Sequence, residues 1–260
     1  MSPLAGELGR IAHDAGRLIL KHYANVGEVR TKADSSPVTK ADEEAEALIL
    51  ERLAGLEPGV PVVAEESVAK GHVPKLGARF FLVDPLDGTK EFLQKNGEFT
   101  VNIALIEHGR PVAGVVIAPA KARAFVGDGS NGAFELAAPE DLPLEVDAAQ
   151  RIRARRPSSD GLVAVVSRTH RDTKTEQYLE AYPVAGMVAA GSSLKFCLVA
   201  TGEADLYPRH GTTMEWDTAA GQAVLEAAGG SVTTLEGIPL TYGKTAHRFV
   251  NPHFVARGLV

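Results

Sequence analysis

Two aspartates lie three residues apart in the stretch LVDPLDGTKEF, which covers residues 82–92. Asp84 and Asp87 follow an apolar run that we expect to be a buried strand over residues 80–83, and Gly88 stands directly behind the second aspartate. Carboxylates at the end of a strand are held in place, where they can bind a cation or take part in proton transfer. Asp, Pro and Gly are also common turn residues, so this stretch alone leaves a plain turn open.

More carboxylates stand at the ends of other expected elements. Glu65 and Glu66 end an apolar run, and Asp217 begins an expected helix in the second half of the chain. These groups cannot converge in one cleft without counterions, because like charges repel. Mg²⁺ is a suitable counterion, since it binds carboxylate and carbonyl oxygens. The pattern therefore favours a two-metal site for phosphoryl chemistry over a plain turn.

The residues behind Asp87 suit an anion. We expect Asp87-Gly88-Thr89 to begin a helix. Glycine lets the backbone approach a ligand closely, and the free N–H groups at a helix start attract negative charge. The carboxylates would then hold metal ions, while the metal ions and the helix start would hold a phosphate.

Helical and strand periodicities indicate the elements that must position these residues. Helices are expected at residues 4–19, Thr39–Leu53, the first part of 191–207, and 216–230; strands at 58–64, 80–83, 161–168 and the end of 191–207; hairpins at 101–119 and 124–136. The segment 138–161 is rich in Pro and charge and is the expected boundary between two halves. The pattern is helices with an antiparallel sheet first, then alternating helices and strands.

Length and charge limit the class of protein. The chain has 260 residues, with 27 Lys plus Arg against 33 Asp plus Glu and a formal net charge of −6. This balance argues against a nucleic-acid binder, which normally carries a basic face. The single cysteine allows no internal disulfide and fits a reducing compartment. No signal peptide or integral membrane segment is apparent, so we expect a cytoplasmic protein; weak peripheral attachment to a membrane is left open.

Three short motifs have simpler explanations. GDGSNG at 127–132 matches G-x-G-x-x-G, but a returning strand follows it where a dinucleotide site needs a helix, so we interpret it as a hairpin turn. Gly243-Lys244-Thr245 lacks the preceding glycine of a P-loop and is interpreted as a loop. Cys197 lies on an apolar helix face and is expected in the core.

The chain resembles the inositol monophosphatase superfamily in three blocks: AEES at 64–67, DPLDGTKEF at 84–92 and WDTAAG at 216–221. Longer stretches, KADSSPVTKAD, NGEFTVNIALI and GSSLKFCLVATGEADLYPR, resemble the bacterial 3′(2′),5′-bisphosphate nucleotidases of that superfamily. The resemblance implies an α/β (α+β) fold, a layered αβαβα sandwich of the inositol monophosphatase and fructose-1,6-bisphosphatase type. Residues 1–150 would form an α+β half with the metal motifs, and residues 151–260 an α/β half with the specificity residues, in one compact unit.

The resemblance also implies a metal site with two or three Mg²⁺ ions. Glu65, Asp84 and the main-chain carbonyl of Leu86 would bind one ion, and Asp84, Asp87 and Asp217 would bind a second. Gly88 and Thr89 would bind the scissile phosphate through backbone N–H groups. Asp42 would accept a hydrogen bond from the Thr89 hydroxyl and so orient the attacking water, although Thr39-x-x-Asp42 is also a helix-start pattern.

Specificity is expected to come from the second half. By resemblance, Ser192, Lys195, Arg209 and His170 would contact the nucleotide, together with Asp87 and Asp217 at the metal site. The alternative interpretations are a helix cap for Ser192, a solvated helix lysine for Lys195, a surface arginine for Arg209 and a loop histidine for His170. His210 stands where we expect an aromatic ring, so base stacking should differ in detail.

The function implied is Mg²⁺-dependent hydrolysis of the 3′-phosphate of adenosine 3′,5′-bisphosphate to AMP and phosphate, with the 5′-phosphosulfate analogue as a possible second substrate. A phosphatase for inositol 1-phosphate or another sugar phosphate remains an alternative, because the metal blocks are shared. A further alternative is that the protein is not an enzyme but a regulator that binds a metal or a nucleotide. The expected partner is a small nucleotide substrate, bound by a monomer or a homodimer.

Overall fold

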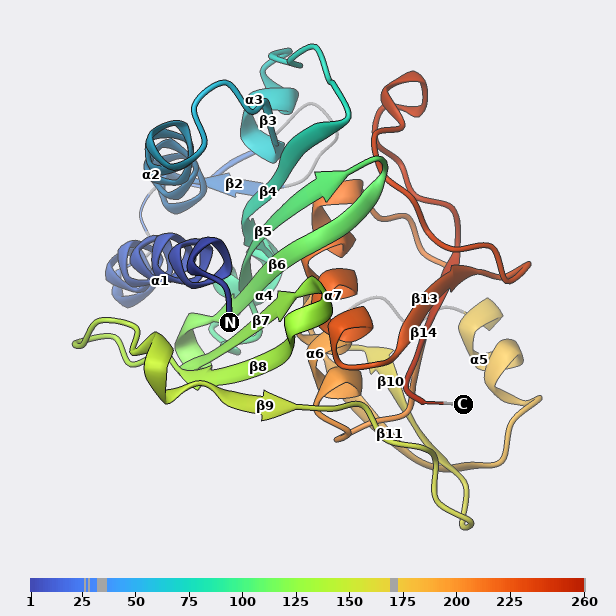
Figure 1. Cartoon of the computed structure of the whole chain (residues 1–260). Helices are drawn as coiled ribbons and strands as arrows, with labels where there is room; N and C mark the ends of the chain where they lie inside the picture. The colour runs from blue at the N-terminus through green and yellow to red at the C-terminus, as the bar shows by residue number, and fades with distance from the viewer. Residues whose placement is uncertain (26, 28, 32–36, 169–172, 260) are drawn as a thin grey trace.

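The computed structural model describes residues 1–25, 27, 29–31, 37–168 and 173–259. Its main elements form five layers, in the order helices, sheet, helices, sheet, helix (Figure 1). The α-helices are α1 (Pro3–Ala24), α2 (Lys40–Leu56), α3 (Glu65–Ala69), α4 (Thr89–Leu93), α5 (Thr173–Leu179), α6 (Leu194–Ala200) and α7 (Glu215–Ala227). The strands are β1 (Val29–Thr31), β2 (Pro37–Thr39), β3 (Val62–Ala64), β4 (Arg79–Asp87), β5 (Thr100–Glu107), β6 (Arg110–Ala118), β7 (Arg123–Asp128), β8 (Gly132–Ala137), β9 (Gln150–Ile152), β10 (Leu162–Ser167), β11 (Val184–Ala190), β12 (Leu206–Arg209), β13 (Ser231–Thr234) and β14 (Phe254–Arg257).

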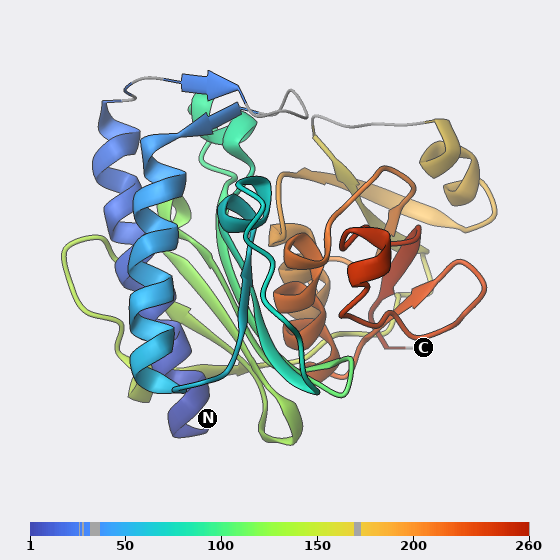
Figure 2. The same ribbon diagram turned by 90° about the horizontal axis from the view of Figure 1, so that it is seen from above.

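Helices α1 and α2 form the first layer. Apolar residues recur along α1 at helical spacing, and Leu8, Ile11 and Ile19 are buried against the sheet. The Ser2 hydroxyl caps α1 by accepting the Ala5 N–H at 3.3 Å. The two helices lie side by side over one face of the first sheet, as Figures 1 and 2 both show. Both helices were expected from the sequence, and both extend a few residues further.

The first sheet has seven strands in the order β3-β4-β5-β6-β7-β8-β9. Strands β3 and β4 are parallel, and the other neighbours are antiparallel. Alternate side chains point to opposite faces, so Val83 packs toward α1 and α2 while Leu82 packs toward α6 and α7. Because both faces are covered, the middle of each central strand is apolar without polar alternation, as in residues 80–83 of β4 and 103–106 of β5. The two expected hairpins are confirmed as β5–β6 and β7–β8.

Helix α7 lies close to the first sheet because two glycines face it. A Cβ added to Gly127 would lie 2.4 Å from the main-chain oxygen of Ala223, and one on Gly114 would lie 2.6 Å from the Ala223 Cβ. Contacts that short do not occur, so neither position has room for a side chain. Gly127, the first glycine of GDGSNG, therefore allows α7 to pack closely against the sheet. The motif itself forms the expected hairpin turn between β7 and β8.

The second sheet has five strands in the order β11-β10-β12-β14-β13. Strand β10 is parallel to β11 and β12, while β14 is antiparallel to β12 and β13. Helices α6 and α7 lie between this sheet and the first, and α5 lies on its outer side (Figure 1). The sequence predicted β10, α6, β12 and α7 but gave no signal for α5, β11, β13 or β14.

Two expected boundaries were wrong. Strand β4 does not end at Val83 but continues through Asp87, so both aspartates belong to the strand. The expected linker 138–161 contains β9, which is an edge strand of the first sheet. The division at residues 150 and 151 stays a prediction, because α7 packs against the first sheet from the second half. No helix within the described ranges has the length and apolar character needed to cross a membrane.

Candidate active site

A cavity of about 530 Å³ lies where the two halves meet. The end of β4, the start of α4, the turn before α6, the end of β12 and the start of α7 all contribute to its wall. Eight of the residues predicted from the sequence line it: Glu65, Asp87, Gly88, Thr89, Ser192, Lys195, Arg209 and Asp217. Asp42, Asp84 and Leu86 are buried around it without lining it. His170 lies outside the described residues.

A bulge in β4 sets the spacing of the two aspartates. Asp84 pairs with Asn102 and Asp87 with Thr100, so three steps along β4 match two along β5. The extra residue bends the strand and changes the direction of the side chains. The Asp84 Oδ1 accepts the Leu86 N–H at 3.0 Å, which fixes the bulge from within. The bulge brings Asp87 to the cavity wall and leaves Asp84 only 2% exposed behind it.

Asp87 is held by residues that the motif does not contain. Its Oδ2 accepts the Ser193 N–H at 2.7 Å and lies 2.9 Å from the Ser193 hydroxyl. Asn102 lies behind that hydroxyl and donates to it at 2.8 Å. Neither Asn102 nor Ser193 was marked as a site residue by any pattern in the sequence. The serines that precede an expected helix suggest N-caps, but the Ser193 side chain makes no capping bond and lies against Asp87.

Asp217 occupies the third position of α7, where its Oδ2 accepts the Met214 N–H at 2.8 Å. Burial raises the pKa of Asp217 well above its usual value, and the charges of Asp87 and Glu65 raise it further. Burial also raises the pKa of Asp87, although the Lys195 ammonium opposes that shift. Two half-buried carboxylates that repel each other favour a proton or a cation between them.

This donor set fits Mg²⁺ in chemistry. Asp87, Asp217 and Glu65 supply only oxygen atoms, which hard divalent cations prefer. No three acidic, histidine or cysteine side chains in the described part of the chain form a compact ligand group. The fit therefore rests on the mutual repulsion of the half-buried Asp87 and Asp217 and on the charge of Glu65, not on a cage that is already closed.

The Thr89 hydroxyl donates to Asp42 Oδ1 at 3.2 Å. The other oxygen of Asp42 accepts the backbone N–H and the hydroxyl of Thr39, at 2.8 and 2.7 Å, in a capping box at the start of α2. Asp42 therefore makes the contacts of both interpretations at once, one with each carboxylate oxygen, while its role in orienting water stays a prediction. The helix start fixes the carboxylate, and the carboxylate fixes the direction of the Thr89 hydroxyl.

Gly88 has φ of +91°, and a Cβ there would lie 2.2 Å from the Ser192 hydroxyl oxygen. Any larger residue would clash with the turn before α6, so Gly88 is required by both its backbone conformation and its contact. Ser192 itself has φ of +48°, which is unusual for a residue with a side chain. Its hydroxyl lies 2.8 Å from the carbonyl of Asp87.

Lys195 and Arg209 face the same cavity from the second half. Lys195 is only 5% exposed, and its ammonium donates to the Ser192 carbonyl at 2.7 Å, so the alternative of a solvated lysine was wrong. Burial lowers the pKa of Lys195 to about 8, against the opposing charge of Asp87. Arg209 donates to the Thr212 carbonyl at 3.3 Å, while its buried Nε has no partner among the described residues. The Lys195 ammonium and the Arg209 guanidinium thus both place N–H donors near the cavity.

His210 does not lie in the wall of the cavity but next to it, in an aromatic cluster. Its Nδ1 lies 3.0 Å from the Thr175 hydroxyl. Its ring centroid is 5.6 Å from that of Tyr178 and 5.7 Å from that of His253. The residue that departs from the expected aromatic ring therefore still packs among rings.

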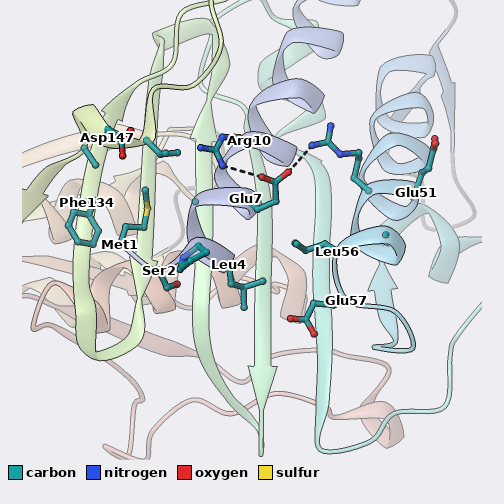
Figure 3. A pocket seen from close by; sticks show the side chains of 16 residues that line it. Met1, Ser2, Leu4, Glu7, Arg10, Glu51, Leu56, Glu57, Phe134 and Asp147 are labelled. Atoms are coloured by element: carbon teal, nitrogen blue, oxygen red, sulfur yellow. Dashed lines mark hydrogen bonds and ion pairs between the residues drawn. The ribbon is translucent and has the colours of Figure 1, made fainter.

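A larger cavity of about 1070 Å³ lies far from these residues, around the start of α1 and the end of α2 (Figure 3). Glu7 is central in its wall and pairs with Arg10 at 3.1 Å and with Arg52 at 2.9 Å. Glu7 is thus paired with two cations at the surface, whereas the smaller cavity gathers half-buried carboxylates beside Lys195 and Arg209. The smaller cavity is the better candidate for chemistry.

Known proteins resemble this chain over nearly its whole length. A family model described as the inositol monophosphatase family matches residues 2–256. The chain is 44% identical over 249 residues to the 3′(2′),5′-bisphosphate nucleotidase CysQ of Escherichia coli K12, which covers 94% of this chain and 96% of the relative. The relative of the same name in Buchnera aphidicola is 38% identical over 253 residues, covering 96% and 92%.

Solved structures show the same fold. CysQ from Bacteroides thetaiotaomicron, a bacterial member of the inositol monophosphatase family, superposes with a TM-score of 0.81 at 36% identity, over 98% of this chain and 96% of that one. An IMPase from Thermotoga maritima gives 0.78 at 25% identity, over 99% and 92%. The expected layered fold is confirmed. The chain belongs to the inositol monophosphatase family.

Proposed function

We propose that this chain is a Mg²⁺-dependent 3′(2′),5′-bisphosphate nucleotidase that hydrolyses the 3′-phosphate of adenosine 3′,5′-bisphosphate to AMP and phosphate. The observation that carries the proposal is one cavity with two kinds of groups. Asp87 and Asp217, both half-buried, lie in its wall together with the cations of Lys195 and Arg209. The first pair suits the metal-assisted cleavage of a phosphate, and the second suits a further phosphate on the same substrate. The CysQ relatives carry the same activity in their names.

Bound Mg²⁺ would supply charge neutralisation and lower the pKa of the attacking water. Glu65, Asp84, Asp87, Asp217 and the Leu86 carbonyl are the residues we propose to hold two or three such ions. Asp84 is already directed by its bond to the Leu86 N–H, and Asp87 by its bonds to Ser193. These neighbours limit the rotation of each carboxylate, so little rearrangement is needed when a cation binds.

The Thr89 hydroxyl has one proton, and it donates that proton to Asp42. The lone pairs of its oxygen are then free to accept a hydrogen bond from water, which directs the lone pair of the water toward phosphorus. The backbone N–H groups of Gly88 and Thr89 would bind the phosphate oxygens. The new bond from water to phosphorus forms as the bond to the 3′-oxygen breaks; the attacking water releases a proton to solvent, and the 3′-oxygen takes a proton from solvent and leaves as a hydroxyl.

Lys195 and Arg209 would bind the 5′-phosphate, with Ser192 beside them, and His170 is proposed as a further contact. A charge-assisted hydrogen bond to phosphate is worth about 1.5–3 kcal/mol, which is roughly ten- to a hundredfold in selectivity. We also propose that the 5′-phosphosulfate analogue is accepted, because its 5′-group is likewise anionic. Inositol 1-phosphate, the second candidate, has no second phosphate to meet these cations.

Parallel assays with Mg²⁺ test the proposal. We expect kcat/KM to be much higher for adenosine 3′,5′-bisphosphate than for inositol 1-phosphate. Lys195→Met and Arg209→Met should lower it for the bisphosphate by roughly ten- to a hundredfold and much less for a single phosphate ester. Lys174→Met, at an exposed lysine of α5, is the matched control and should change neither value. Equal losses on both substrates would contradict the assignment of these cations to the second phosphate.

Ion dependence gives a separate test of the metal proposal. EDTA should abolish activity, Li⁺ should inhibit by replacing one Mg²⁺, and Ca²⁺ should bind without supporting hydrolysis because its geometry is looser. Activity that survives EDTA would contradict the metal site. We further propose a cytoplasmic location, which the single buried cysteine supports, for a monomer or a homodimer.

A further inference from the structure

The turn between β11 and α6 is pressed between two parts of the first half. On one side lies Gly88, where an added Cβ would reach the Ser192 hydroxyl at 2.2 Å. On the other side lies Glu98, and a Cβ added to Gly191 would lie 2.7 Å from the main-chain oxygen of Glu98. Two glycines, one in each half, thus permit a contact with no room for a side chain.

Glu98 makes most of the polar contacts at this place. It lies just before β5 and is only 7% exposed. Its carboxylate accepts both Nε and a terminal nitrogen of Arg168, at 2.7 and 2.9 Å, and the Gly191 N–H at 2.9 Å. The Ser192 hydroxyl lies 2.8 Å from its main-chain carbonyl. We call these four residues (Glu98, Arg168, Gly191 and Ser192) the clasp.

The clasp holds a backbone conformation that the turn would otherwise avoid. The φ of +48° at Ser192 is unfavourable for a residue with a Cβ, and such a conformation persists only when its surroundings enforce it. The next residue, Ser193, supplies the N–H and the hydroxyl that orient Asp87. A relaxed turn would therefore move the donors that fix the Asp87 carboxylate.

We propose that Glu98 is a positioning residue that sets Asp87 for metal binding through the clasp, although Glu98 itself faces neither metal nor substrate. The inference rests on the proposed function for the identity of the metal and the substrate. Its geometric part does not: the Glu98 carboxylate joins Arg168, which follows β10, to Gly191 in the turn before α6, and the Ser192 hydroxyl joins that turn to the Asp87 carbonyl at the end of β4. Arg168 also donates to the Ala189 carbonyl at 2.7 Å, which ties in the end of β11.

The chain offers a matched control for this carboxylate. Asp205 is also buried, at 4% exposure, and accepts Nε and a terminal nitrogen of Arg155 at 2.8 and 3.1 Å. It also accepts a backbone N–H, that of Val163 at 2.7 Å. The Asp205–Arg155 pair lies at the N-terminal end of β10, whereas Arg168 directly follows Ser167, the last residue of that strand. Asp205→Asn removes the same kind of interaction at the opposite end of the same strand.

The experiment compares Glu98→Gln, Arg168→Gln and Asp205→Asn with the wild-type chain. Mg²⁺ alone is titrated by calorimetry, and kcat and KM are measured for adenosine 3′,5′-bisphosphate and for a single phosphate ester. In Glu98→Gln we expect Mg²⁺ affinity to fall about three- to tenfold and kcat to fall about ten- to a hundredfold, equally on both substrates, since small misplacements have effects of that size. KM should change by less than about threefold. Arg168→Gln should change the same quantities in the same direction.

Asp205→Asn should lower the thermal midpoint but leave Mg²⁺ affinity and kcat within about twofold of the wild-type values. If Glu98→Gln behaved like Asp205→Asn, the positioning role would be overturned and Glu98 would serve stability alone. A change of substrate selectivity in Glu98→Gln would also overturn it, because the clasp acts on the part of the site that all substrates share. If the wild-type chain did not hydrolyse the bisphosphate, the proposed function would fail, while the Mg²⁺ titration would still decide the inference.

Discussion

The Asp87 carboxylate depends on residues from two separate segments, the start of α6 and strand β5. Ser193 at the start of α6 supplies two donors, Asn102 on β5 supports the Ser193 hydroxyl, and Lys195 provides the nearby positive charge. A carboxylate that can rotate binds a metal less tightly than one held by hydrogen bonds. The orientation of this aspartate in the first half is therefore set mainly by the second half.

Asp87→Asn tests the role of that charge. Because burial raises the pKa of Asp87, its ionised form destabilises the metal-free protein above the pKa of an unfolded aspartate, and the amide removes this cost. We expect kcat to fall at least roughly a hundredfold, and the thermal midpoint without Mg²⁺ to stay equal or rise. Adding Mg²⁺ should raise the midpoint less than in the wild-type chain. Asp160→Asn, at an exposed position, is the control; near-normal turnover of Asp87→Asn at ordinary Mg²⁺ would contradict the metal assignment.

Sequence reasoning found the groups at the centre of the site but not those around them. Asp87, Gly88 and Thr89 are adjacent in the chain, so their types and spacing could be recognised together. Ser193 and Glu98 reach Asp87 and Arg168 across 106 and 70 residues, and each is a common polar residue beside apolar neighbours. No local pattern distinguishes such a residue from a helix cap or a surface carboxylate, so only the folded chain reveals it.

Helix α7 connects the metal site to both sheets. Its first turn carries Asp217, and its buried Glu215 accepts the N–H groups of Gly243 and Lys244 at 2.7 and 2.8 Å. Its middle crosses the first sheet over Gly127. The position of Asp217 therefore depends on how closely the helix approaches that sheet.

Gly127→Ala tests this close approach. The new Cβ would lie 2.4 Å from the Ala223 main-chain oxygen, and main-chain atoms cannot move aside as a flexible side chain can. We expect a loss of about 1–3 kcal/mol in the free energy of unfolding, measured by urea denaturation. Gly55→Ala is the matched control, because Gly55 lies in α2 with nothing within 4 Å of its added Cβ. It should stabilise by about 0.4–1 kcal/mol, and similar effects of the two substitutions would refute the steric explanation.

Elements with a strong period could be predicted, and the others could not. The apolar stripe of α1 and the two hairpins were visible in the sequence. The bulge in β4 was not, because Asp84 and Asp87 with Pro85 between them look like a turn at a strand end. Strand β11 was also missed: its seven residues, VAGMVAA, are exposed or half-buried except for Ala190, so no polar and apolar alternation marks it.

At the scale of the whole molecule, ion pairs join segments far apart in the chain. Asp205, before β12, binds both Arg155 and the start of β10. Burial alone would raise the pKa of Asp205, but the Arg155 guanidinium and the Val163 N–H lower it below its usual value. A lowered pKa in the folded state means that the folded protein holds the proton more weakly than the unfolded chain does.

The stabilisation by Asp205 should therefore depend on pH in one direction. It is fully present above the pKa of an unfolded aspartate, about 3.9, and is lost as the pH falls through the lower pKa of the folded state. Asp205→Asn should cost about 1.5–3 kcal/mol of unfolding free energy at pH 7, and the difference from wild type should shrink below about pH 4. Denaturant unfolding at a series of pH values measures this. A difference that grew toward low pH would reverse the sign and refute the argument.

The last prediction concerns the two halves as one unit. The cavity takes Asp87 from the first half and Asp217 from the second, and α7 packs on the first sheet while its chain continues into β13 of the second. A cation bound between these carboxylates is bound only when both halves are folded, so it should stabilise them together. At a hundred times the dissociation constant the gain is about 2.7 kcal/mol, or roughly 5–10 °C in the thermal midpoint for a chain of this size. We expect scanning calorimetry to show a single transition that Mg²⁺ moves upward as a whole. Two transitions, with only one of them sensitive to Mg²⁺, would mean that the halves unfold independently and that the cation is held by one half alone.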